Sequence, residues 1–374
     1  LAVHEDLPLV GDRAVGAGAD TERRDVAGGG GDSGGVAEFD AGATGIGGAS
    51  PWSSIVTVTA PAPVDLRTNT RIDPLGLDDP RPELSWRLPA SGTSGQTAWQ
   101  VEVTTGGFSR GKPTGELVWD SGQVEDERPF GHAYAGAVLA SGRSYAWRVR
   151  VWTDAKKPSA WSEPASFETG ILDPALWSAR WVSGPAPASS SDFHTLYLRG
   201  SLDLPGEVVR ARAHVSALGW YRFFVNGTDL TGPALVPRWT PFDSYVEYQT
   251  YDVTAALRAG GNVLAMAVGE GRFRGRNGVD SRRAVYGDRL AGWCQVEVEL
   301  ADGTTRTLVS DASWLAGEGR IVLSDPKYGE RVDLRIPDED WLGDTEPPAR
   351  FAPAEVPPRH HRRLVAEETG RVQQ

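Results

Sequence analysis

Cysteine is almost absent from this 374-residue sequence, in which Cys294 is the only one. A single cysteine can neither close an intramolecular disulfide nor supply a cysteine-rich zinc site. Its strand-like surroundings favour a buried structural thiol. His194, His214 and the pair His360-His361 show no metal-binding spacing with carboxylates, so we predict no metal ion and no cofactor.

Long apolar runs are also missing, and no stretch of about 18 apolar residues is present that would form a transmembrane helix. The sequence opens at Leu1 without a basic region or a long apolar core, so no signal peptide is visible, and we favour a cytoplasmic over a secreted location. The formal net charge of −12 would repel nucleic acid. The sequence contains no Cys/His nucleophile pair, which argues against acyl-transfer chemistry by a thiol.

Residues 1–58 are rich in Gly, Ala, Asp and Ser, and they include the run Gly28-Gly29-Gly30-Gly31. Their apolar side chains are too few and too scattered to offset the entropy of ordering the backbone, so we predict a disordered arm. A phosphate-binding glycine loop would need a strand before it and a helix after it, and the sequence indicates neither.

Apolar and polar residues alternate beyond this arm, which predicts β-strands with one buried face. Gln96–Val103 and Tyr145–Trp152 show the pattern clearly, and in the second segment Arg148 and Arg150 share the face opposite Trp147. Short strands separated by Gly, Pro and Asp turns predict an immunoglobulin-like or fibronectin-III-like β-sandwich over residues 59–171.

A second alternating region predicts a jelly-roll-like β-sandwich over residues 172–345. Asn226-Gly227 and Asp302-Gly303 indicate tight turns, and Val253–Leu257 is long enough for one helical turn. The predicted strands of this region are Thr195–Leu202, Arg210–Val215, Tyr221–Val225, Asn262–Val268, Cys294–Leu300 and Thr307–Ser310.

Residues 346–374 contain five prolines within their first half, a density that excludes a regular helix or a central strand. We predict that this stretch is a proline-rich linker toward a further domain. The fold class predicted for the chain is therefore all-β, with two consecutive β-sandwiches after a disordered glycine-rich arm.

Short motifs follow one another in a characteristic order along the first β region. They are Pro63-Val64-Asp65-Leu66-Arg67, Asp73-Pro74-Leu75-Gly76-Leu77, Pro80-Arg81-Pro82-Glu83-Leu84-Ser85-Trp86, Gln96-Thr97-Ala98, Val118-Trp119-Asp120-Ser121-Gly122 and Phe167-Glu168-Thr169-Gly170. The second β region continues the series with Trp177-Ser178-Ala179-Arg180-Trp181, Gly219-Trp220-Tyr221, Val225-Asn226-Gly227, Pro237-Arg238-Trp239-Thr240, Tyr286-Gly287-Asp288-Arg289, Ser310-Asp311-Ala312-Ser313-Trp314 and Tyr328-Gly329-Glu330.

Together these motifs, over about residues 60–345, resemble the N-terminal half of bacterial α-L-rhamnosidases of the inverting, six-hairpin-barrel class. The resemblance implies an Ig-like module followed by a β-sandwich, with the catalytic acid and base on a helical barrel. Two departures stand out. Arg272 replaces an aromatic residue that the family pattern would place there, and the sequence has no Asp-Asn pair of the kind that holds calcium in some relatives.

An inverting glycosidase needs two carboxyl groups roughly 6.5–9.5 Å apart, one acting as acid and one as base. Gly287-Asp288-Arg289 looks similar to the family's catalytic stretch, but it lacks the following Glu and lies among predicted strands. We therefore interpret Asp288 as a turn residue that caps the backbone or pairs with a nearby Arg, and we predict no catalytic residue in this chain.

Loop-placed aromatic residues beside Arg and acidic residues are typical of sugar-binding sites, because rings stack on C–H faces while polar groups bind hydroxyls. Seven residues in the loops of the second region fit this pattern and are predicted to contact substrate or another domain: Trp239, Arg272, Phe273, Arg276, Tyr286, Asp288 and Glu330.

The sequence thus predicts the non-catalytic N-terminal accessory region of an α-L-rhamnosidase that hydrolyses terminal α-L-rhamnosides. Its partners would be rhamnose-containing glycans or glycosides and a C-terminal helical barrel of the same polypeptide, with no nucleic acid and no membrane. The alternative is a free-standing carbohydrate-binding protein without catalytic activity, and a third hypothesis is a scaffold of two sandwiches.

Overall fold

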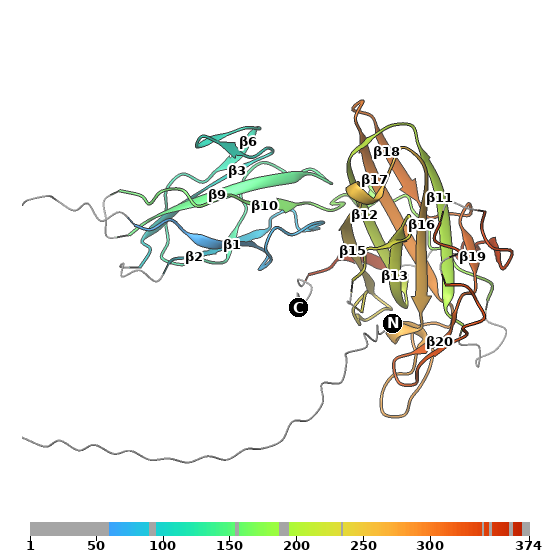
Figure 1. Ribbon diagram of the computed structural model, residues 1–374. Helices are drawn as coiled ribbons and strands as arrows, with labels where there is room; N and C mark the ends of the chain where they lie inside the picture. The colour runs from blue at the N-terminus through green and yellow to red at the C-terminus, as the bar shows by residue number, and fades with distance from the viewer. Residues whose placement is uncertain are drawn as a thin grey trace, which may run out of the picture. The chain divides into compact units, whose positions relative to one another are not determined.

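The structure is a computed structural model that describes residues 60–89, 95–153, 157–186, 194–232, 235–338, 340–343, 346–358 and 362–368. The predicted glycine-rich arm and the pair His360-His361 lie outside these residues. The described chain is built almost entirely from β-strands, as predicted (Figure 1). Its helical elements are single turns, namely η1 (Pro174–Leu176), η2 (Thr254–Ala256) and α1 (Gly271–Arg274).

The first sandwich consists of two antiparallel sheets and a small hairpin. One sheet has the order β1 (Val64–Thr68), β2 (Glu83–Arg87) and β8 (His132–Ala133). The other has the order β10 (Ala165–Glu168), β9 (Ser144–Trp152), β3 (Ala98–Thr104) and β6 (Leu117–Asp120), with β7 (Val124–Glu125) also paired to β3. The hairpin is β4 (Phe108–Ser109) with β5 (Lys112–Pro113).

Aromatic side chains dominate the core of the first sandwich. Trp86, Trp99 and Trp147 are buried there, and the first two lie edge to face with ring centroids 5.8 Å apart. On the opposite face of β9, the guanidinium of Arg148 lies 4.4 Å from the Trp161 ring and bonds Glu102 at 2.6 Å. The predicted alternation of β9 is therefore confirmed, although its polar face is itself covered.

The second sandwich pairs a six-stranded with a five-stranded sheet. The first has the order β14 (Thr228–Asp229), β13 (Trp220–Val225), β16 (Gly260–Gly269), β11 (Leu196–Leu204), β19 (Leu315–Gly317) and β22 (Phe351–Pro353). The second has the order β18 (Thr305–Val309), β17 (Ala291–Leu300), β12 (Val208–Leu218), β15 (Tyr245–Asp252) and β23 (Arg363–Ala366). A separate hairpin is formed by β20 (Ile321–Asp325) and β21 (Gly329–Val332).

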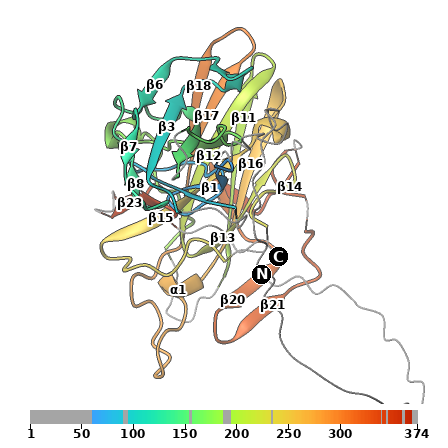
Figure 2. The same ribbon diagram turned by 90° about the vertical axis from the view of Figure 1, so that its left-hand side faces the viewer.

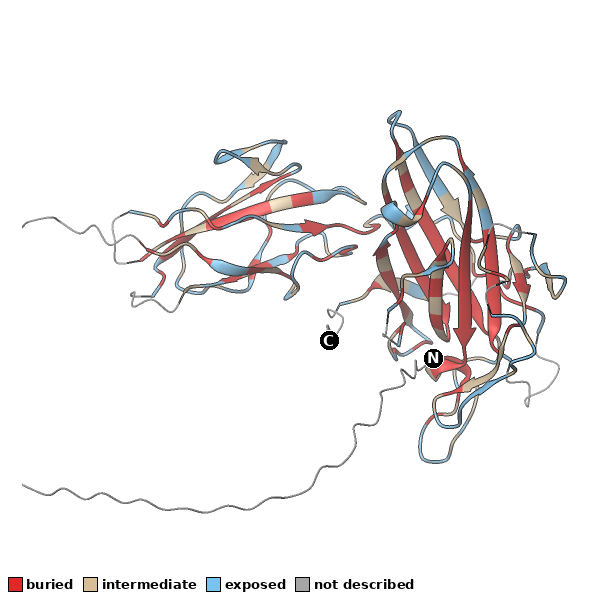
Figure 3. Ribbon diagram, viewed as in Figure 1, coloured by how far each residue is buried: buried red, intermediate tan, exposed pale blue. Residues whose placement is uncertain are grey.

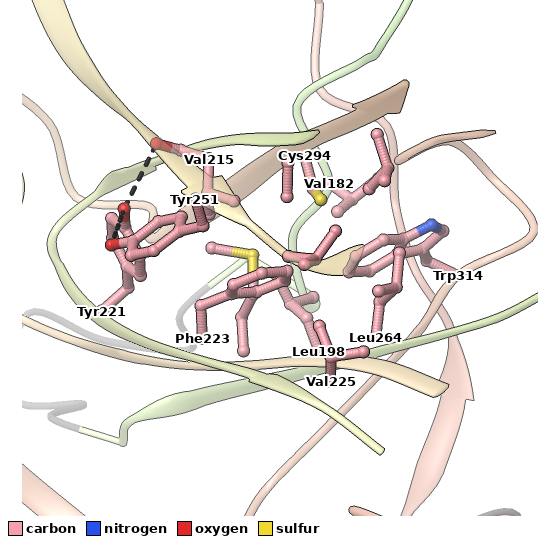
Figure 4. Close-up of a cluster of buried hydrophobic side chains, with 14 of the residues drawn as sticks. Val182, Leu198, Val215, Tyr221, Phe223, Val225, Tyr251, Leu264, Cys294 and Trp314 are labelled. Atoms are coloured by element: carbon pink, nitrogen blue, oxygen red, sulfur yellow. Dashed lines mark hydrogen bonds between the residues drawn. The ribbon is translucent and has the colours of Figure 1, made fainter. Parts of the chain in front are cut away.

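The core of the second sandwich lies between these sheets, where the strands are buried along most of their length (Figure 3). Figure 4 shows Phe223, Leu198 and Leu264 of one sheet facing Val215 and Cys294 of the other. The only cysteine is buried, as predicted, and this burial raises the pKa of its thiol. Burial of this much apolar surface is the main stabilising contribution to such a fold.

Three buried polar side chains bond one another between the two sheets. The Tyr221 hydroxyl donates to the Gln249 Oε1 at 2.9 Å. It also lies 2.9 Å from the Tyr251 hydroxyl (Figure 4). Buried hydroxyl groups without partners would be costly, so this small network holds β13 against β15 across the sandwich.

Local turn chemistry agrees with the sequence. Asn226 and Gly227 both have positive φ, 48° and 84°, at the turn from β13 to β14. Gly303 has a φ of 81° at the turn from β17 to β18. These are the conformations for which Asn-Gly and Asp-Gly are favoured in hairpins, and both predicted turns are confirmed. The jelly-roll topology of the sandwich stays a prediction.

The prediction of a linker from residue 346 onward is wrong for the residues that the structure describes. β22 pairs antiparallel with β19, and β23 pairs parallel with β15. Both are edge strands of the second sandwich, where proline is tolerated because one side of the strand has no ladder partner. The prolines therefore exclude a central strand but allow these short edge strands. The second sandwich extends past the predicted boundary at residue 345.

None of the described helices is long and apolar enough to cross a membrane.

His214 provides a pH-dependent test of this fold. It is buried on β12 with its Nδ1 3.0 Å from the Thr250 hydroxyl, and burial, followed by the charges of Arg210 and Arg212, lowers its pKa to about 3. Below about pH 6.5 the unfolded chain binds a proton at this residue that the folded chain does not. We expect the free energy of unfolding to fall by about 2 kcal/mol from this residue between pH 7 and pH 5.

The measurement is urea unfolding at both pH values. His214→Asn, which keeps a polar group near Nδ1 but cannot titrate, should lose less stability on acidification than the wild type. Equal pH dependence in wild type and His214→Asn would contradict this account.

Candidate functional site

Six of the seven predicted site residues lie in two neighbouring segments, the loop from β16 to β17 (residues 270–290) and the hairpin β20–β21. Figures 1 and 2 place α1 and this hairpin at the same end of the second sandwich. The two segments are bonded directly, because the Glu270 amide donates to the Ser324 carbonyl at 3.2 Å and the Lys327 Nζ donates to the Ser281 hydroxyl at 3.0 Å. We call this end of the second sandwich the rim.

A buried charge cluster anchors the rim. Glu270, which is 0% exposed, accepts from the Arg274 Nε at 3.0 Å and from the Arg283 Nε at 3.1 Å. Arg274 also donates to the His194 carbonyl at 2.7 Å. Burying a carboxylate costs free energy unless it has such cationic partners. Because Arg274 and Arg283 both bond Glu270, the cluster fixes both ends of the segment between residues 270 and 283.

Three of the predicted site residues come together on the rim. The Trp239 Nε1 donates to the Tyr286 hydroxyl at 3.2 Å, and the Arg272 guanidinium lies over the Trp239 ring, 5.1 Å from its centroid. Trp239 itself is 55% exposed. We call Trp239, Arg272 and Tyr286 the aromatic platform.

Phe273 does not lie on the surface. The prediction that its ring contacts a sugar or another domain is therefore wrong. Its side chain is only 2% exposed and packs edge to face on Phe242, with centroids 5.6 Å apart. A Cβ at position 287 would lie 2.5 Å from the Phe273 ring, so Gly287 is what lets the loop close over it. The helical turn of α1 directs Phe273 inward while the neighbouring Arg272 faces Trp239.

The other predicted residues lie apart from the aromatic platform. Arg276 pairs with Asp325 at 3.3 Å and lies 4.5 Å from the centroid of the exposed Tyr328 ring. Glu330 is exposed on β21, with its Oε1 3.4 Å from the Ser324 hydroxyl.

Asp288 is exposed, and the adjacent Arg289 pairs with Glu355. Its interpretation as a turn residue that caps the backbone or pairs with a nearby Arg stays a prediction. The sequence prediction also missed Asp325, although the Asp-Pro step at 325 is a turn signal. The Asp325 carboxylate accepts from the Lys327 amide at 2.8 Å and orders the hairpin turn.

Carboxyl groups inside the described structure are neutralised by arginine. The four buried ones are Glu168, which pairs with Arg210 and Arg212; Glu247, with Arg238; Glu270, with Arg274 and Arg283; and Asp325, with Arg276. A glycosidase acid instead needs a carboxyl group whose pKa is raised, so that it holds a proton near neutral pH.

The pKa values of the more exposed carboxyl groups also argue against a proton-donating acid. Hydrogen bonds from the Arg128 and Arg335 side chains lower the pKa of Asp126 and of Asp333 to about 2. Within the described ranges, every carboxyl group with a shifted pKa is shifted downward. These groups suit salt bridges and turns rather than proton donation.

The described residues contain no group of three or more His, Cys, Asp or Glu side chains that could hold a metal ion.

Two family models match this chain. Residues 63–173 match the model described as "Rha78A-like, N-terminal immunoglobulin domain", and residues 206–374 match the one described as "Alpha-L-rhamnosidase N-terminal domain". The first match corresponds to the first sandwich, and the second covers most of the second sandwich, including the edge strands β22 and β23.

Individual relatives are similar over the same region. An α-L-rhamnosidase from Formosa agariphila is 30% identical over 280 residues, which cover 72% of this chain and 30% of the relative. The solved structures of α-L-rhamnosidases from Dictyoglumus thermophilum and Aspergillus terreus have TM-scores of 0.72 and 0.73 at 28% and 25% identity, each covering 82% of this chain and 35% of the other. The chain thus spans about a third of the length of the relatives that it matches.

The charge cluster gives a stability test of the rim. Glu270→Gln would leave two buried guanidinium groups without their counter-charge, and we expect a loss of about 3–5 kcal/mol in the free energy of unfolding, measured in urea. Asp280→Asn is the matched control in the same loop, because its pair with Arg282 is exposed and should contribute about 0–1 kcal/mol. Similar losses in both variants would show that the cluster does not anchor the loop.

Proposed function

The chain belongs to the α-L-rhamnosidase family as an N-terminal region of such a protein, and on that premise we propose that it is the non-catalytic accessory part of an enzyme that hydrolyses terminal α-L-rhamnosides. In this role the chain supports a separate catalytic domain, and the rim of the second sandwich lies next to that domain. The substrates of the whole enzyme would be rhamnose-containing glycans or glycosides.

The observation that carries the proposal is the state of the buried carboxyl groups. All four in the described residues are held by arginine, and none is paired with a second carboxyl group across an open site. Inverting hydrolysis requires a protonated acid on one side of the glycosidic oxygen and a base on the other. Asp288, the residue that resembles a catalytic aspartate in sequence, stands alone on an exposed turn.

Support for a partner domain comes from the surface of the rim. Large apolar side chains are exposed there on both segments: Val279, Val285, Tyr328, Val332 and Leu334. Large apolar side chains that are exposed on neighbouring segments are typical of contact sites. A helical barrel of the same polypeptide is the partner that we propose for this surface, since the α-L-rhamnosidases that this chain matches are more than twice as long as it.

The proposal predicts that the 374-residue chain alone releases no nitrophenol from p-nitrophenyl α-L-rhamnoside, because no described acid and base flank a substrate site. A full-length α-L-rhamnosidase serves as the positive control, and nitrophenol absorbance at alkaline pH gives the rate.

Asp288→Asn provides the matched variant for this assay. Release by the wild-type chain that disappears in Asp288→Asn would locate catalysis within this chain and would overturn the proposed accessory role.

A further inference from the structure

The edge strand β23 has little support within its own sheet. It has four residues, and it lies beside β15 at the outer edge of the five-stranded sheet, paired in parallel (Figure 2). A short parallel strand gains few ladder bonds, and elements with few bonds open locally before the rest of a fold does. The docking of β23 therefore needs contacts beyond its ladder with β15.

The ladder uses only one edge of β23. The Arg363 amide donates to the Ser244 carbonyl and the Glu367 amide donates to the Tyr248 carbonyl, both at 3.1 Å. Successive amides of a strand point to opposite edges, so the amide of Ala366 faces away from β15. At a free sheet edge such an amide would be left to water.

The first sandwich bonds this second edge of β23. The Ala366 amide donates to the Asp78 Oδ2 at 2.7 Å, and the Arg71 Nη1 donates to the Glu367 carbonyl at 2.7 Å. Arg71 and Asp78 both lie in the loop between β1 and β2. Hydrogen bonds from or to charged groups are stronger than neutral ones, so this loop provides a substitute for a neighbouring strand.

The loop that carries these two residues is anchored in the first sandwich. Leu77, which precedes Asp78, is 1% exposed and belongs to the core of that sandwich. Its amide donates to the Glu168 carbonyl at 2.9 Å, and its carbonyl accepts from the Gly170 amide at 2.6 Å. The position of the Asp78 carboxylate is therefore set by the folding of the first sandwich.

The same region of the first sandwich also contacts β15 and β12 directly. Gly76 has a φ of 72°, and a Cβ at this position would lie 2.0 Å from the Thr250 Oγ1 on β15. The buried Glu168 carboxylate pairs with Arg210 and Arg212 of β12, both at 2.7 Å. A close backbone approach and a buried ion pair thus hold the loop against the sheet that β23 joins.

We propose that the first sandwich is a clamp that keeps β23 docked on β15, with Arg71 and Asp78 as the clamping residues. The clamp itself goes beyond the proposed accessory role. Its consequence rests on that role, in which a catalytic domain follows β23 in the sequence, because the clamp would then fix the point from which that domain continues.

The alternative is that the second sandwich holds β23 without help. The half-buried Leu364 packs against the apolar cluster that contains Phe242 and Trp293, and this contact is independent of the first sandwich. We favour the clamp because four residues with one packed side chain bury little apolar surface, whereas both bonds from the first sandwich involve a charged group.

Amide hydrogen exchange of the full 374-residue chain tests the clamp. The informative amides are those of Arg363 and Glu367, because they bond the β15 side and report undocking of the strand. In Arg71→Ala/Asp78→Ala their exchange should become about tenfold faster or more, the effect of losing two charge-assisted bonds. Arg81→Ala is the matched control, because Arg81 is an exposed arginine of the same loop whose side chain bonds no atom of β23 in the described structure.

Gly76→Ala is a second variant that leaves both clamping side chains in place. The added Cβ forces the loop away from Thr250, so exchange at Arg363 and Glu367 should again become faster. Exchange at β23 that stays at the wild-type rate in the double variant overturns the clamp. Equal acceleration throughout β12 and β16 also overturns it, since that pattern shows a general loss of stability. Neither result depends on the nitrophenol assay, so failure of the clamp is distinct from failure of the accessory role.

Discussion

The buried carboxylate of Glu270 is the interaction on which the functional end of the second sandwich depends. It lies where β16 ends and α1 begins, and the guanidinium groups of Arg274 and Arg283 reach it from two points of the following loop. A charge in this position must be paired, and the pairing fixes a segment that has no β-ladder of its own. Because Glu270 and Arg274 are one helical turn apart, Arg272 projects from another side of that turn and meets Trp239.

Phe273 links this electrostatic anchor to the aromatic platform. It is buried against Phe242, Phe242 packs on Tyr286, and Tyr286 bonds the indole of Trp239. Each contact in the series limits the motion of the next side chain. The orientation of the exposed Trp239 ring therefore depends on the packing of the buried Phe273 ring. Phe273 is thus a buried packing residue beneath the aromatic platform, and the exposed groups are those of Trp239 and Arg272.

The sequence alone was sufficient for the elements that depend on local patterns. Period-two alternation identified β9 and the central strands of the second sandwich, and Asn226-Gly227 identified a hairpin turn, because both signals arise from neighbouring residues. The sequence-based prediction failed for features that depend on contacts between residues far apart in the chain. The burial of Phe273 depends on Phe242 and Gly287 far away in the chain, and β23 forms only because β15 offers a free edge. The aromatic platform was anticipated as separate residues, but the bond from Trp239 to Tyr286 has no signature in the sequence.

The likeness to known α-L-rhamnosidases shows the fold, and a fold does not determine which ligand a sandwich binds. The departure at position 272 shows how the rim can differ while the sheets stay alike. The resemblance would place an aromatic residue at position 272, and this chain has Arg272, whose guanidinium lies over the Trp239 ring. The rim of this chain therefore carries a ring beside a cation. That combination is suited to a ligand with both an apolar face and hydroxyl groups, which a purely aromatic surface would hold less selectively.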